Sequence, residues 1–269
     1  YNPTINIYIR NLMKKNIFHL VELRPWPIIS SINANIFFIS IIKFIKYKTN
    51  TLLIFSLSTL ALSSLLWWSS MNRERSIQGL HNKKTHTLFK AGIALFIASE
   101  VLLFTSIFWN FFHLSFEASV AIYGNWPPNS LSFTNPYLFP IYGTILLISS
   151  SFIASKAHQA TTTKAVNYYP INKNLLKSVI LGFLFLDIQL IEYSQSNSAI
   201  ITFNQNPFRR IFFMTTGLHG SHVFVGLLFL SYTLYFREKN YLSIKKHSSL
   251  IIAVWYWHFV DVMWLFVYY

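Results

Sequence analysis

Long apolar stretches make up most of the chain, and polar residues collect in short segments between them. A helix needs about 20 mostly apolar residues to cross the hydrocarbon core of a membrane. The stretches lack the alternation of polar and apolar positions that membrane β-strands show, so they predict helices. Seven candidate membrane spans follow, at residues 28–45, 51–71, 88–116, 137–156, 175–195, 210–236 and 248–269. We therefore expect an all-α, polytopic membrane protein.

Helix-breaking residues stand where this assignment needs connections. Prolines precede the first span at Pro25 and Pro27, and Asn206-Pro207 precedes the sixth. Proline is disfavoured inside helices because it lacks a backbone N–H and clashes with the preceding turn. We expect two parts, an N-terminal segment over residues 1–27 and a single seven-helix transmembrane domain over residues 28–269.

Composition and charge point to the same class. Charged residues are 11% of the chain, hydrophobic residues are 53%, and the formal net charge is +14. With the spans laid out alternately, 17 of the 22 Lys and Arg residues lie on the side of the N-terminus. This asymmetry places the N-terminus on the positive, inner side and accounts for the charge without nucleic acid as a partner. The absence of Cys excludes disulfides, thiolate metal sites and a cysteine nucleophile.

Acidic residues inside the spans are the first candidate functional groups. They are Glu100, Asp187, Glu192 and Asp261. An acid in hydrocarbon is costly, so each needs a partner or a protonated state. Glu100 has no basic residue within one helical turn, and we expect a neutral carboxylic acid that is hydrogen-bonded to another helix. Its role is open between joining helices, lying on a proton path, and forming a pair of no special role.

Histidines form the second set of candidates. His219 and His222 share a helix face, and they could bind a metal or haem or pack across a close helix interface. His258 and Asp261 are one turn apart, as a hydrogen-bonded pair or as a carboxylate that orients a metal-bound or proton-carrying imidazole. The sequence shows no nucleotide-binding loop and no Ser-His-Asp arrangement, so it is a poor candidate for a self-contained enzyme.

Several residue-specific motifs, in order along the chain, resemble subunit 3 of the haem–copper oxidases, mitochondrial cytochrome c oxidase type. The earlier motifs are Arg24-Pro25-Trp26-Pro27, Trp67-Trp68, Arg73-Glu74, Gln78-Gly79, Ser99-Glu100-Val101 and Trp126-Pro127-Pro128. The later ones are Asn135-Pro136, Gln189 with Glu192-Tyr193, Gly217 to Val223, and Trp255 to Phe266. The chain departs from the family pattern at Ser69-Ser70, where Arg-Asp is common, and at Asp187, which is usually apolar.

The resemblance implies a non-redox core subunit that stabilises the oxidase and supports proton uptake. It implies partner subunits 1 and 2, which carry haem a, haem a3, CuA and CuB, together with accessory subunits. No metal or haem is expected on this chain itself. Phospholipids are expected in a cleft between a group of helices 1–2 and a group of helices 3–7. The expected location is the mitochondrial inner membrane, with the N-terminus in the matrix and the C-terminus in the intermembrane space.

Residue roles also follow from the resemblance. Glu100 matches the acid that a hydrophobic carbodiimide modifies in family members. The expected lipid contacts are Trp68, Glu74, His81 and Arg237. The expected structural polar contacts are His113, Glu192, His219, His222, His258 and Asp261. Two alternatives stay open: subunit 3 of a quinol oxidase, and a proton-coupled transporter or channel with Glu100 and Asp261 on its path.

Overall fold

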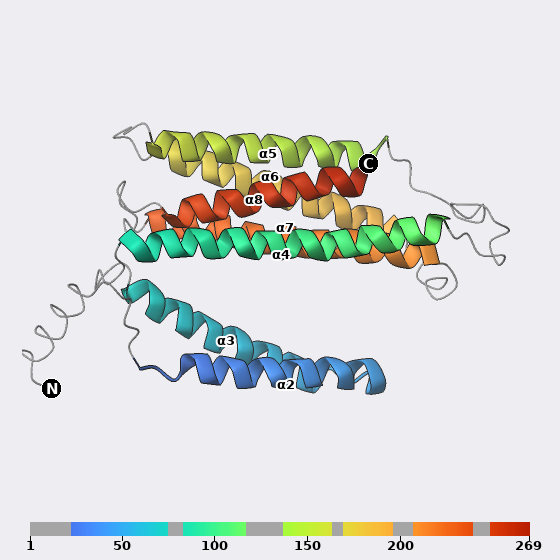
Figure 1. The fold of residues 1–269 in the computed structure, drawn as a ribbon, viewed down its shortest axis with the longest axis horizontal. Helices are drawn as coiled ribbons and strands as arrows, with labels where there is room; N and C mark the ends of the chain where they lie inside the picture. The colour runs from blue at the N-terminus through green and yellow to red at the C-terminus, as the bar shows by residue number, and fades with distance from the viewer. Residues whose placement is uncertain (1–22, 75–82, 117–136, 163–168, 196–206, 239–247) are drawn as a thin grey trace, which may run out of the picture. The chain divides into compact units, whose positions relative to one another are not determined.

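A computed structural model describes residues 23–74, 83–116, 137–162, 169–195, 207–238 and 248–269. These residues form helices and no strand (Figure 1). The helices are α2 (Trp26–Tyr47), α3 (Thr51–Arg73), α4 (Lys83–Phe116), α5 (Phe139–Thr162), α6 (Tyr169–Gln195), α7 (Pro207–Glu238) and α8 (Ser248–Tyr268). All seven are long and apolar enough to cross a membrane, which confirms the predicted spans and the all-α class.

Several helices extend beyond the predicted apolar stretches. Helix α6 begins at Tyr169 rather than at residue 175, and α5 continues to Thr162 rather than ending at residue 156. Hydropathy marks the part of a helix that lies in hydrocarbon, whereas a helix satisfies its own backbone equally well in the polar zone beyond it. The expected N-terminal segment 1–27 falls mostly on residues 1–22, which lie outside the described residues.

The chain divides into two compact units, Tyr1–Phe89 and Lys90–Tyr269. In the first unit, α2 and α3 pack against each other, and their only buried residues are the serines Ser30, Ser40, Ser56 and Ser63. The hydroxyl oxygens of Ser40 and Ser56 lie 2.7 Å apart across the pair. Small side chains allow two helix backbones to approach closely, which is a common way for membrane helices to associate.

An ion pair links the start of α2 to the end of α3. The Arg24 guanidinium, just before α2, pairs with the Glu74 carboxylate at the end of α3. Arg24 also donates a hydrogen bond of 3.0 Å to the Ser70 hydroxyl. Both charged side chains are nearly buried, so each depends on the other for compensation.

The second unit has an apolar core with a tryptophan at its centre. Helix α5 packs on α6 and α8, and α7 packs on the same two helices. The indole of Trp257 on α8 is fully buried and donates a 3.0 Å hydrogen bond to Ser150 on α5. It occupies space that a Cβ atom at Gly182 or Gly226 would need, since such atoms would lie 2.7 Å and 2.8 Å from the ring. Trp257 thus contacts three helices at once.

Helix α4 joins this bundle through long side chains. Phe104 packs edge-on against Phe259 of α8, and Phe96 stacks on Tyr256 of the same helix. Phe104 is fully buried. Figure 1 shows that helices α4 to α8 lie side by side with roughly aligned axes within the second unit, and that neighbouring helices such as α5 and α8 run in opposite directions. This packing positions the polar side chains in the middle of α4, α5, α7 and α8.

Candidate functional site

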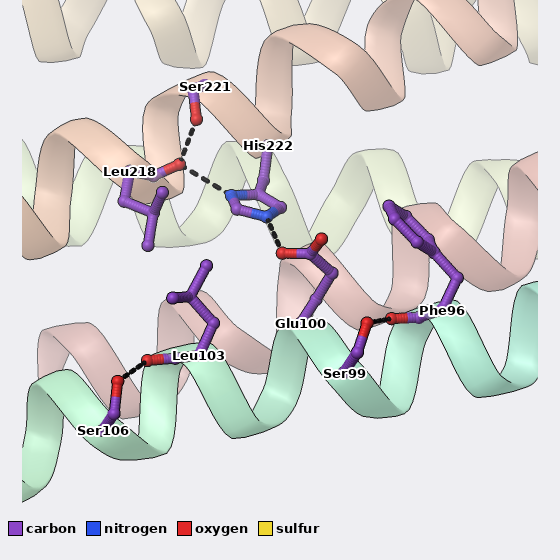
Figure 2. A network of polar contacts seen from close by, with 8 residues as sticks. All are labelled: Phe96, Ser99, Glu100, Leu103, Ser106, Leu218, Ser221 and His222. Atoms are coloured by element: carbon purple, nitrogen blue, oxygen red, sulfur yellow. Dashed lines mark hydrogen bonds and ion pairs between the residues drawn. The ribbon is translucent and has the colours of Figure 1, made fainter.

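Glu100 on α4 and His222 on α7 form a direct contact inside the second unit (Figure 2). The Glu100 carboxyl Oε2 lies 2.8 Å from the His222 ring Nε2. The other ring nitrogen, Nδ1, lies 2.8 Å from the carbonyl oxygen of Leu218. A carbonyl can only accept, so Nδ1 carries a hydrogen and donates it. Glu100 therefore meets Nε2, the nitrogen whose protonation can vary.

This geometry leaves two arrangements of a single proton. The proton is either on Glu100, which then donates to a neutral imidazole, or on His222, which then donates to a carboxylate. Both arrangements contain the same number of protons and no net charge. A proton can therefore pass between these two atoms, which lie 2.8 Å apart, without a change in the total charge of the pair. A change in net charge would be costly in an apolar setting.

The surroundings of the pair are apolar. Exposure is 9% for the His222 side chain and 19% for that of Glu100. The rings of Phe104, Tyr256 and Phe259 lie around the imidazole. The nearby hydroxyls of Ser99 and Ser106 donate to carbonyl oxygens of their own helix, at Phe96 and Leu103, rather than to the pair (Figure 2). The apolar setting strengthens the interaction between the two groups.

His219, one turn before His222, has a different environment. Its side chain is fully buried, and neither ring nitrogen has a hydrogen-bond partner among the described residues. Its contacts are aromatic: the ring lies 5.1 Å from that of Trp264 and 5.8 Å, edge-on, from that of Phe185. We expected a polar contact for His219, and within the described residues it packs among rings instead.

The middle of α5 and α8 contains a second polar cluster. His258 Nδ1 lies 2.6 Å from the Ser151 hydroxyl, and Nε2 lies 2.9 Å from the Ser155 hydroxyl. Asp261 lies three residues further along α8, and its buried carboxyl Oδ1 has no hydrogen-bond partner among the described residues. Both ring nitrogens of His258 therefore contact serine hydroxyls. These contacts differ from those of a hydrolytic triad, in which the imidazole lies between one serine and one carboxylate.

The remaining polar candidates differ in burial. On α6, Gln189 donates a 3.2 Å hydrogen bond to Glu192, and both side chains are buried. The neighbouring Tyr193 donates a 2.6 Å bond to Thr216 of α7. Asp187 is exposed on α6, and His113 is exposed towards the end of α4. Of these contacts, the bond from Tyr193 to Thr216 joins α6 to α7.

The four expected lipid contacts lie in different surroundings. Trp68 on α3 is 53% exposed, whereas Glu74 is buried in its ion pair with Arg24. Arg237 is buried at the end of α7 in the second unit. His81 lies outside the described residues. Sequence reasoning missed the Arg24–Glu74 pair, although both residues belong to motifs that it singled out.

Within the parts of the chain that the structure describes, no group of three or more His, Cys, Asp or Glu side chains is placed to hold a metal ion. His222 and His258 each direct both ring nitrogens at oxygen atoms of this chain. The hydrogen bonds of these two histidines therefore join α4 to α7 and α5 to α8.

Comparison with known proteins gives a consistent result. Residues 16–269 match the family model described as cytochrome c oxidase subunit III. The chain is 39% identical to cytochrome c oxidase subunit 3 of Rhipicephalus sanguineus over 252 residues, 93% of this chain and 96% of that protein. It is 35% identical to the Drosophila melanogaster subunit 3 and 34% identical to that of Mus musculus, each over 93% of this chain and 94% of the relative.

Proposed function

Since this chain belongs to the cytochrome c oxidase subunit III family, we propose that it is a non-redox core subunit of that oxidase. The complex passes electrons from cytochrome c to oxygen and moves protons. Subunits 1 and 2 would carry haem a, haem a3, CuA and CuB, and accessory subunits would surround them. The names of the relatives favour this complex over a quinol oxidase.

The proposed location is the mitochondrial inner membrane, with the N-terminus in the matrix and the C-terminus in the intermembrane space. The distribution of Lys and Arg supports this orientation, because positive residues favour the inner side. The proposed division remains an N-terminal matrix segment over residues 1–27 followed by the transmembrane domain over residues 28–269.

Within the complex the chain would stabilise the catalytic core and support proton uptake. The observation that carries this proposal is the Glu100–His222 pair, which holds one proton between two helices in an apolar setting. In the resting state of the pair, Glu100 would be protonated and neutral. This is the form of the acid that reacts with a hydrophobic carbodiimide. A pair of this kind can pass a proton from one member to the other without creating net charge in the bundle.

The test replaces Glu100 in the assembled oxidase. Glu100→Gln keeps the side-chain shape but cannot ionise. Oxygen uptake should stay near that of the unaltered complex, with a modest fall in proton release in reconstituted vesicles or in endurance during turnover. Ser99→Ala is the matched control, because its hydroxyl bonds only its own helix. Complete loss of both oxygen uptake and proton release in a fully assembled complex would contradict an auxiliary role.

The chain would also bind phospholipid through Trp68, Glu74, His81 and Arg237. An exposed indole on α3 and a guanidinium at the end of α7 are suitable groups for a lipid headgroup. The paired changes His81→Ala and Arg237→Ala should reduce the phospholipid that co-purifies with the complex. Arg210→Ala, exposed at the opposite end of α7, is the control. Unchanged lipid content after the paired changes would count against these contacts.

A further inference from the structure

Asp187 differs from the other acidic residues of the membrane spans in the direction of its side chain. Glu100 is bonded to His222, and Glu192 is buried beside Gln189 on α6. Asp261 is half-buried on α8. Asp187 is exposed on α6, on the outer face of the helix bundle formed by the second unit. Its carboxyl therefore points away from the core of that unit.

The surface around Asp187 is apolar. Phe183 and Leu184 lie one turn before it, and Leu190 and Ile191 lie one turn after it. Residues three and four apart share a helix face, so these four side chains border the carboxyl on both sides. All four are large and between 44% and 65% exposed. Asp187 is thus the acidic member of an apolar surface, which we call the Asp187 face.

The carboxyl also lies deep in the membrane span. The span of α6 runs over Pro170–Ser194. At a rise of 1.5 Å per residue, Asp187 lies about 7.5 Å from the middle of this span and about 10 Å from its Ser194 end. Lysine and arginine reach the membrane surface from such depths through their long stems. The aspartate side chain has a single methylene and cannot do so.

Cations of α6 and α7 are too far away to compensate the carboxyl. Lys177 precedes Asp187 by ten residues, or about 15 Å. The bond from Tyr193 to Thr216 aligns α6 with α7, which runs in the opposite direction. Asp187 lies six residues from this bond towards the membrane centre, and Arg210 lies six residues from it the other way. They are therefore about 18 Å apart along the bundle, more than an arginine side chain spans.

Cations of the remaining helices of the second unit are equally distant. By the same alignment, His222 of α7 lies at the depth of Asp187, and both its ring nitrogens are already bonded. Lys90 lies ten residues before Glu100, the partner of His222, and so about 15 Å away along α4. Helix α8 contains no Lys or Arg over Ser248–Tyr268. On α5, Gly143 lies against Phe185, which leaves Lys156 about 20 Å from this depth.

An acid in this position needs a partner outside the second unit. Ionisable residues within membrane spans almost always face protein or water rather than lipid, and they pair with one another. A protonated aspartic acid would still leave an O–H and a C=O without hydrogen bonds in hydrocarbon. Lipid tails offer neither a charge nor a hydrogen bond. The carboxyl therefore indicates that protein covers the Asp187 face.

We propose that the Asp187 face is an interface for a transmembrane helix of another oxidase subunit, and that this helix carries a lysine or arginine opposite Asp187. A carboxylate and a cation form charge-assisted hydrogen bonds and leave no net charge in the membrane. A second copy of this chain is a poor occupant, because the same face would present another Asp187 and apolar side chains instead of a cation. The proposal rests on the proposed membership of this chain in the oxidase.

The first experiment identifies the occupant by photo-crosslinking in the purified, assembled oxidase. A benzophenone amino acid replaces Leu190, one turn from Asp187, and mass spectrometry identifies the crosslinked peptide. We expect a membrane segment of another subunit with a lysine or arginine within one turn of the attachment point. Crosslinks only to lipid, to a second copy, or to α2 and α3 would overturn the proposal, as would a segment without a cation. Failure of the proposed function would appear separately, as a preparation of this chain that lacks haem absorbance.

The second experiment tests the charge of Asp187 in the same complex. Asp187→Asn keeps a hydrogen-bonding group but leaves the cation unpaired, so the amount of the crosslinked subunit that co-purifies should fall at least about tenfold. Asp187→Glu should retain that subunit. Ser194→Ala is the matched control, because this serine is exposed two turns further along α6 and bonds only Ile191 of its own helix.

A compensating change guards against a general folding defect. Replacing the identified cation by leucine in the partner, together with Asp187→Leu, should restore co-purification, because two apolar side chains then meet. Full retention of the subunit in Asp187→Asn would show that a hydrogen bond, rather than a charge pair, joins the helices, and it would overturn the proposed cation. Loss in the Ser194→Ala control, or no recovery in the double leucine variant, would likewise contradict the pairing.

Discussion

The two units of the chain hold their helices together with different kinds of buried side chain. The α2–α3 pair buries serines and places an ion pair at its end. The second unit buries large apolar side chains, among them Trp257, Phe104 and Phe185. Both units have apolar outer surfaces, with exposed leucines and isoleucines on α2 and α3 as well as on α4 to α8.

The difference follows from the number of helices that meet. Lipid tails are as apolar as leucine, so two helices in a membrane gain little from burying leucine between them. A pair gains by close approach and by polar bonds. Where several helices surround a common centre, a large side chain can contact several neighbours at once, and dispersion contacts add up. Trp257 reaches α5, α6 and α7 in this way.

The largest effect is expected for the ion pair of the first unit. Arg24→Ala leaves the nearly buried Glu74 without its partner, and such losses cost about 3–5 kcal/mol. Hydrogen exchange of peptides from α2 and α3 in the purified complex should rise. Arg73→Ala, an exposed cation next to Glu74, is the control. Equal hydrogen exchange in the two variants would mean that the positive charge of this region, rather than the Arg24–Glu74 ion pair, stabilises α2 and α3.

A smaller effect is expected from added volume in the second unit. A Cβ at Gly182 would lie 2.6 Å from Leu227 and 2.7 Å from the Trp257 ring. Gly182→Ala should lower the free energy of unfolding by about 1–3 kcal/mol, because the ring has nowhere to move. Thermal denaturation of the complex followed by tryptophan fluorescence measures it. Gly92→Ala, where a Cβ meets nothing, should be neutral or stabilising. Similar melting of the two variants would contradict tight packing around Trp257.

The smallest effect is expected for a single serine of the α2–α3 pair. Ser40→Ala removes the contact with Ser56, but Ser56 keeps its 3.0 Å bond to Leu53 within α3. Interhelical hydrogen bonds in membranes average about 0.6 kcal/mol, and we expect a loss of that size. A double-mutant cycle with Ser56→Ala isolates the energy of this contact. The cycle is measured by hydrogen exchange of peptides from α2 and α3. Ser58→Ala, exposed on α3, should change nothing. A coupling far above this value would show that the pair relies on hydrogen bonds more than on close approach.

Local patterns predicted a defined part of this structure. Each apolar stretch is visible in a short window, so all seven spans could be found. Glu100, His222 and Asp261 stand out in the sequence because ionisable side chains are rare in such apolar stretches. Their partners could not be predicted, because Glu100 and His222 are 122 positions apart and meet only through helix packing. Ser151 and Ser155 gave no signal, since a serine in a membrane helix usually bonds its own backbone, as Ser150 does.

The position of Trp257 has a consequence for the order in which the bundle is completed during synthesis. The chain is made from its N-terminus, so α6 and α7 enter the membrane before α8. Until then, Leu227 of α7 can pack at Gly182, but the indole that packs at both Gly182 and Gly226 is still missing. The indole arrives with the last helix. A chain that stops short of α8 would therefore lack the one side chain described above as contacting α5, α6 and α7 together, so these helices would be less tightly packed before α8 is inserted.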